Sequence, residues 1–202
     1  MGTHGIGSTR RRQLRALACA SVLVVLGMPA SAIGQDIKPG ENAPPAPRAE
    51  DVRSIDAILA SLYGTISGPA GPRDWDRLRG LCIPGARLIP CRRGADATAT
   101  ARVLSVDDYI KASDAVLRQQ GFFEREIHRR VERFGGIAHV FSTYESRHAA
   151  ADAEPFARGI NSIQLFHDGA RWWIVTIFWD SERPDQPIPA DYLPPREPKP
   201  RP

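Results

Sequence analysis

The sequence predicts an α+β fold in which a curved antiparallel sheet wraps around helices that come earlier in the chain. Two β-rich runs, Ile160–Phe166 and Trp172–Trp179, flank the turn dipeptide Asp168-Gly169, and this pattern predicts a hairpin. Helical spacing dominates before Gly121, and strand-like runs dominate after it. Helices followed by consecutive strands are typical of α+β proteins rather than of alternating α/β folds.

Three helices are expected ahead of the sheet. Apolar residues three and four apart predict the first over Val52–Ser67, and Trp75, Leu78 and Leu81 share one side of a short second helix, Asp74–Leu81. The third, Val106–Gln120, opens with the capping box Ser105-Val-Asp-Asp108 and is expected to end at Gly121.

The strands before the hairpin are less uniform in pattern. Arg87–Pro90 and Thr98–Leu104 are expected as short paired strands, and Ile137–His148 is a clear strand rich in β-branched and aromatic residues. Phe122–Phe134 fits a helix or a strand by spacing, but the glycines on both sides and its length favour a strand. An extended segment near Ile188–Leu193 is expected to dock on the domain.

The closing strand Trp172–Trp179 has no polar face. Alternation predicts one face made of Trp173, Val175, Ile177 and Trp179, and the other of Trp172, Ile174, Thr176 and Phe178. Helices can cover only one of these faces. A second copy of the chain is therefore expected on the other, giving a homodimer through the sheet face.

The ends of the chain differ in composition from its middle. A cluster of Arg, an apolar run and Ala30-Ser31-Ala32 predict a signal peptide over residues 1–32, cleaved near Ala32, with a retained N-terminal anchor as the alternative. A proline-rich linker (33–50) leads into a domain over 51–193, and a proline-rich tail (194–202) follows. The mature protein is expected to be periplasmic or secreted and not held in a membrane. General secretion and twin-arginine export both remain open.

Net charge gives no support for nucleic-acid binding. The leader holds four Arg and no acid, so removing it from the 27 Lys and Arg of the chain leaves 23 bases against 23 acids. The basic character of the whole chain thus belongs to the leader, and no nucleic-acid partner is expected.

Two cysteines, Cys82 and Cys91, remain after the leader. In an exported protein, with Pro84 and Gly85 bending the chain between them, a disulfide closing this short loop is expected. The alternative is two separately buried thiols on neighbouring strands. No metal site is expected, because the neighbourhood offers too few ligands.

Three stretches carry a resemblance to a known superfamily: Phe134-Gly-Gly-Ile-Ala-His-Val-Phe-Ser-Thr-Tyr-Glu145, Arg158-Gly-Ile-Asn-Ser-Ile-Gln-Leu165 and Asp168-Gly-Ala-Arg-Trp-Trp-Ile-Val175. With the helices before them, they resemble a nuclear transport factor 2-like domain of the SnoaL-like type over Asp51–Leu193. The resemblance implies a cone with a pocket open at one end. That superfamily includes ketosteroid isomerase, polyketide cyclases, scytalone dehydratase and many domains without enzymatic activity, so the fold does not decide the function.

Seven residues are candidates for lining this pocket, as aromatic, amide or imidazole groups in apolar surroundings: Tyr63, Tyr109, His139, Tyr144, Asn161, Gln164 and Trp179. No local motif matches one enzyme's catalytic set. We therefore expect a cofactor-free domain that binds a small apolar ligand or mediates association. The alternative is a cofactor-free isomerase, cyclase or dehydratase with a His or carboxylate base. A His or acid beside a Tyr or Asn in the cavity would favour catalysis, and a cavity of apolar groups and amides would favour binding.

Overall fold

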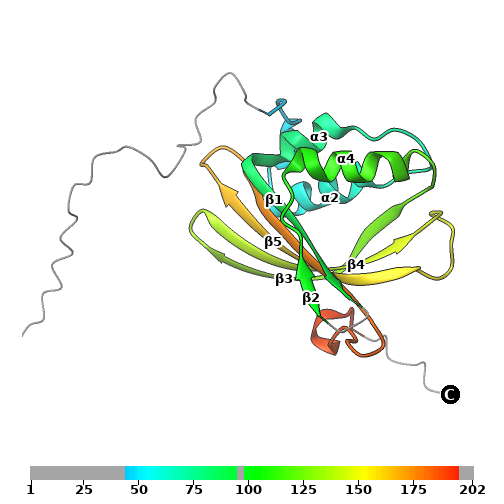
Figure 1. Ribbon diagram of the computed structural model, residues 1–202. Helices are drawn as coiled ribbons and strands as arrows, with labels where there is room; N and C mark the ends of the chain where they lie inside the picture. The colour runs from blue at the N-terminus through cyan, green and yellow to red at the C-terminus, as the bar shows by residue number, and fades with distance from the viewer. Residues whose placement is uncertain (1–43, 95–97, 196–202) are drawn as a thin grey trace, which may run out of the picture. The chain divides into compact units, whose positions relative to one another are not determined.

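A six-stranded curved sheet with its main helices on one side forms the domain in the computed structural model, which describes residues 44–94 and 98–195 (Figure 1). The elements in chain order are α1 (Ala49–Val52), α2 (Ile55–Ile66), α3 (Trp75–Leu81), β1 (Cys82–Arg93), β2 (Ala99–Ala101), α4 (Val106–Leu117), β3 (Phe123–Phe134), β4 (Ile137–Arg147), β5 (Ala157–His167), β6 (Trp172–Ser181) and a 3₁₀ turn (Ala190–Tyr192). The predicted signal peptide, most of the linker and residues 196–202 of the tail lie outside the described residues.

Side-chain caps set where the helices begin. Ser54 accepts a hydrogen bond from the amide of Ala57 (3.0 Å) and starts α2, so the first predicted helix begins at Ile55 rather than at Val52, which ends the separate short helix α1. The capping box of α4 is confirmed, because Ser105 and Asp108 each bond the other's backbone amide. The helix ends at Leu117, earlier than predicted.

The sheet is mixed, and this corrects the prediction of a purely antiparallel one. Its order is β2-β1-β6-β5-β4-β3; β3 to β6 are antiparallel neighbours, whereas β1 lies parallel to β6. Strands joined by a hairpin must run antiparallel, but β1 and β6 are far apart in sequence and no turn dictates their direction. The α+β fold class with a curved sheet around helices is confirmed.

The cysteine prediction is wrong. Cys82 begins β1 and Cys91 lies near the end of the same strand, and both thiols are free, the first buried and the second half-buried. Nine residues of extended chain separate two Cα atoms by roughly 25–30 Å, far beyond the span of about 4–7 Å that a disulfide bridges. The alternative is correct in that the two thiols are separate, but they lie on one strand rather than on neighbouring strands, and only Cys82 is fully buried.

A β-bulge in β6 changes which side chains face the helices. Leu165 pairs with Ile174 but Gln164 pairs with Thr176, so Val175 is an extra residue on β6. Trp172 and Ile174 face inward before the bulge, and Ile177 and Trp179 face inward after it. The two faces predicted by strict alternation are therefore wrong on one side of the bulge.

The core lies between α2, α3 and the inner face of the sheet, with Ile58, Leu78, Val140, Ile163 and Ile174 fully buried. On the outer face the chain after β6 packs back on the sheet: Ile188 is buried, and the Thr143 hydroxyl donates to the Tyr192 carbonyl (2.6 Å). No helix among residues 44–94 and 98–195 is long and apolar enough to cross a membrane.

Candidate functional site

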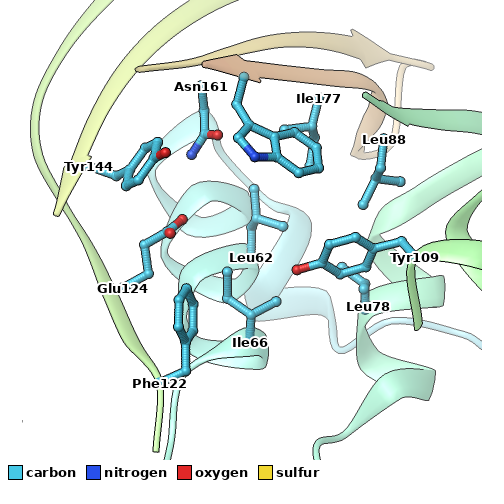
Figure 2. A pocket seen from close by; sticks show the side chains of 11 residues that line it. Leu62, Ile66, Leu78, Leu88, Tyr109, Phe122, Glu124, Tyr144, Asn161 and Ile177 are labelled. Atoms are coloured by element: carbon cyan, nitrogen blue, oxygen red, sulfur yellow. The ribbon is translucent and has the colours of Figure 1, made fainter. Parts of the chain in front are cut away.

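A cavity of about 220 Å³ lies between the helices and the inner face of the sheet (Figure 2). Every main helix and strand except β2 contributes to its wall, and the lining is mostly apolar: Leu62, Ile66, Leu78, Leu88, Tyr109, Phe122, Glu124, Tyr144, Asn161, Ile177 and Trp179. We call it the Glu124 pocket, after the one carboxyl group among these eleven residues.

Helix spacing, a β-bulge and strand register bring these groups together. Leu62 and Ile66 are four apart and share the buried stripe of α2. The bulge of β6 turns Ile177 and Trp179 from the outer to the inner face. Glu124 pairs with Ser146 across the β3–β4 ladder, and a pair of directly opposite residues points to the same face.

Glu124 forms the polar end of the pocket. Its Oε2 accepts a hydrogen bond from the Ser146 hydroxyl (2.9 Å), and its backbone exchanges hydrogen bonds with the hydroxyl of Ser67, just after α2 (2.9 and 3.0 Å). Burial raises the pKa of Glu124 to about 7, although hydrogen bonds from Ser146 and Asn161 act in the opposite direction. Near neutral pH this carboxyl can therefore take up or release a proton.

A chain of buried polar groups continues behind the pocket wall. The Asn161 amide donates from Nδ2 to the Tyr63 hydroxyl (3.1 Å), which lies 2.6 Å from the Ser142 hydroxyl. Ser142 in turn donates to Glu126. Burial raises the pKa of Tyr63 far above its ordinary value, so Tyr63 stays a neutral phenol.

Aromatic rings line the side of the pocket opposite Glu124. Tyr109 lies between Trp75 and Trp179 with its ring edge-on to both, at centroid distances of 6.4 and 6.2 Å. Figure 2 shows its hydroxyl reaching into the pocket from the side opposite Glu124 and Tyr144. Burial raises the pKa values of Tyr109 and Tyr144 to about 12, so both hydroxyls are neutral.

Five of the seven candidate residues lie at or directly behind this pocket. Tyr109, Tyr144, Asn161 and Trp179 line it, and Tyr63 lies one layer behind, bonded to Asn161.

His139 and Gln164 do not reach the pocket, and placing them there was wrong. Both are on the outer face, because His139 precedes the inward-facing Val140 and pairs with Gln164 across the β4–β5 ladder. His139 Nε2 is 2.8 Å from the Ser162 hydroxyl, and its ring is edge-on to Phe141.

Glu124, Phe122 and Ser142 could not be recognised as site residues from the sequence pattern. Glu124 lies in a run of alternating charges that looks like a solvated face, and its opposite residue Ser146 becomes visible only with the strand register. Among residues 44–94 and 98–195, no group of three or more His, Cys, Asp or Glu side chains is arranged to hold a metal ion.

Fold and site together define a cone-shaped α+β domain with a carboxyl at one end of an apolar pocket. Solved structures that resemble the fold include an NTF2-like protein of unknown function from Silicibacter pomeroyi (16% identity, 64% of this chain and 94% of that one, TM-score 0.43). A provisionally assigned scytalone dehydratase from Novosphingobium aromaticivorans (12%, 65% and 83%, TM-score 0.47) and a provisionally assigned ketosteroid isomerase from Shewanella frigidimarina (13%, 67% and 99%, TM-score 0.40) are also similar.

No protein-family model and no curated protein matches the chain. At such identities the likeness is one of fold alone, so any function rests on this chain's own residues.

Proposed function

We propose that the protein binds a small, largely apolar molecule in the Glu124 pocket, with a polar group of that molecule against Glu124 and Asn161. One observation carries the proposal: a carboxyl and an amide converge at one end of a cavity whose other walls are apolar and aromatic. A dry cavity of about 150 Å³ accommodates benzene. A volume of about 220 Å³ therefore suits a single substituted ring or a molecule of similar size.

Native mass spectrometry of the purified chain tests this proposal, because it reports any retained small molecule directly. We expect a bound species of low mass that is released by denaturation, or saturable binding of added phenol. Protein that carries nothing and binds no single-ring compound at millimolar concentration would contradict the proposal.

A second candidate function is proton transfer within that pocket, as in a cofactor-free isomerase, cyclase or dehydratase. The pKa of about 7 at Glu124 favours it, since a base or acid poised near the working pH is the most effective. The variant Glu124→Gln separates the two candidates. An enzyme would lose turnover and keep ligand binding, whereas a binding protein would show no turnover with either residue.

We also propose that the protein is exported and that it associates through its sheet. The basic and apolar leader ending at Ala32 supports export. Mass spectrometry of protein recovered outside the cytoplasm should find a chain starting at Ile33.

Exposed apolar side chains on the outer face of the sheet, among them Phe134, Ile137 and Phe166, support pairing with a second copy.

A further inference from the structure

The hydrogen bonds behind the pocket run in one donor-to-acceptor direction, from Asn161 through Tyr63 and Ser142 to Glu126. The carboxylate of Glu126, at the end away from the pocket, determines this direction. Arg129 donates from Nε to Glu126 Oε1 (2.6 Å), and its guanidinium also binds Asp56 on α2 (2.6 Å). A bulge between Glu126 and His128 allows Glu126 and Arg129 to lie on the same face of β3. Held by Arg129, the ionised Glu126 can only accept hydrogen bonds.

The donor and the acceptor of each following hydrogen bond are then fixed in turn, because a hydroxyl group has only one proton to donate. Ser142 donates its proton to Glu126, so its oxygen must accept from Tyr63. Tyr63 then has no proton left, so Asn161 must donate to it from Nδ2. Asn161 and Glu124 both line the pocket, and Asn161 lowers the pKa of Glu124, as an N–H group directed towards a carboxylate does. This orientation of the amide leaves its carbonyl oxygen, rather than its NH₂ group, available to a ligand.

We propose that Glu126, acting through Ser142 and Tyr63, fixes the Asn161 amide so that the polar end of the Glu124 pocket accepts a hydrogen bond from a ligand hydroxyl. This rests on the proposed binding function and names the ligand class: a small uncharged alcohol or phenol. Glu126, Ser142 and Tyr63 are positioning residues in this scheme. None of the three lines the pocket.

One substitution should reverse the donor–acceptor direction of every hydrogen bond from Glu126 to Asn161. In Glu126→Gln the amide oxygen accepts from Arg129, as the carboxylate does now, and Nε2 then faces Ser142 as a donor. Ser142 accepts and must donate to Tyr63, and Tyr63 must donate to Asn161. The Asn161 amide turns over, and its oxygen comes to face Tyr63 and Glu124.

A ¹³C NMR titration of the Glu124 carboxyl distinguishes this reversal from simple charge removal. Removing the negative charge of Glu126 favours ionisation of Glu124 and by itself lowers the pKa of Glu124. Reversal replaces an N–H donor by a carbonyl oxygen, which disfavours the carboxylate, so we expect the pKa to rise by about half a unit or more. The control Glu132→Gln removes an equal charge from an exposed position of the same strand and should leave the pKa unchanged. A fall or no change in Glu126→Gln would overturn the proposal.

Phenol and anisole, which differ by one methyl group on the oxygen, test the ligand class at pH 8.5. The wild-type protein should bind phenol about tenfold more tightly, the value of one good hydrogen bond. Glu126→Gln should lose or invert this preference, and Tyr63→Phe should lose it. Equal binding of both probes by the wild type would overturn the hydroxyl assignment. Binding of neither probe, with the pKa rise still observed, would reject the binding function and leave the directed chain standing.

Discussion

Glu124 is a buried carboxyl whose ionisation opposes folding. The unfolded chain ionises this carboxyl near its ordinary pKa of 4.5, whereas the folded protein holds its proton until about pH 7. Between these values the folded state binds more protons than the unfolded state, so the contribution of Glu124 to stability falls as the pH rises. A carboxyl that lowers stability in this way is typical of sites that bind or react.

The variant Glu124→Gln should remove this penalty. At pH 8 we expect it to be more stable than the wild type, by at most about 3 kcal/mol, since each unit of pKa shift corresponds to about 1.4 kcal/mol. Near pH 4.5 the two proteins should be almost equal in stability. Urea unfolding at both pH values measures this, with Glu132→Gln as the control. A difference that does not depend on pH would show that Glu124 is not a buried acid.

Asp51 shows the opposite behaviour. It is buried, Arg77 binds both of its oxygens (2.7 Å each), and Ser61 donates to it (2.7 Å). The hydrogen bonds from Arg77 lower the pKa of Asp51 against the effect of burial, so the contact stabilises the fold at neutral pH and loses its contribution as the pH falls through the lowered value.

Asp51→Asn should therefore destabilise the protein by about 2–3 kcal/mol at pH 7, below the range for a fully buried pair because Arg77 remains partly exposed. The loss should shrink in acid, where the wild-type carboxyl is protonated as well. Chemical unfolding at pH 7 and pH 3 provides the comparison. An equal loss at both values would mean that packing, and not charge, is what the substitution removes.

At the scale of elements, local chemistry was readable from the sequence and long-range pairing was not. The box Ser105-Val-Asp-Asp108 fixes the start of α4 through contacts within four residues, and the turn that contains Asp168-Gly169 joins β5 to β6 as a hairpin. The parallel pairing of β1 with β6, which also separates Cys82 from Cys91, depends on chain segments far apart in sequence.

The pocket could be predicted in part for the same reason. Tyr109, Tyr144 and Asn161 stand out as polar-tipped groups in apolar elements, and all three line it. Glu124 is hidden in a charged strand, and only the β3–β4 register shows that it faces inward. Bulges in β3 and β6 each shift a face by one residue, and alternation alone cannot locate them.

Gly159 lies on β5 where the backbone of β6 and the ring of Tyr144 leave no room for a side chain. A Cβ atom there would lie 2.4 Å from the carbonyl oxygen of Asp180 and 2.5 Å from the hydroxyl of Tyr144. Gly159→Ala should push β6 and the Tyr144 ring apart and destabilise the protein by about 1–3 kcal/mol. Thermal unfolding checks the stability, and Gly64→Ala, where a Cβ meets nothing within 4 Å, is the matched control. Equal melting temperatures would contradict this packing.

At the scale of the whole domain, the two faces of the sheet differ in what covers them. Helices bury the inner face, while the chain around Ile188 and Tyr192 covers only part of the outer one. Four large apolar side chains remain exposed on that outer face: Phe134, Ile137, Phe166 and Phe178. A water-exposed patch of this kind favours association, and pairing of two copies is its simplest closed form.

Ile137→Lys combined with Phe166→Lys should break the proposed dimer. The two residues are directly opposite across β4 and β5, so two charges would have to be buried at the centre of the contact. We expect light scattering to find dimers of the wild type at micromolar concentration and monomers of the variant, whose dimer dissociation constant should be at least about tenfold larger. Val103→Lys is the control, because Val103 is 62% exposed, like Ile137 at 60%, but precedes α4 away from this face. A monomeric wild type, or a control that dissociates equally, would show that the outer face is not where two copies meet.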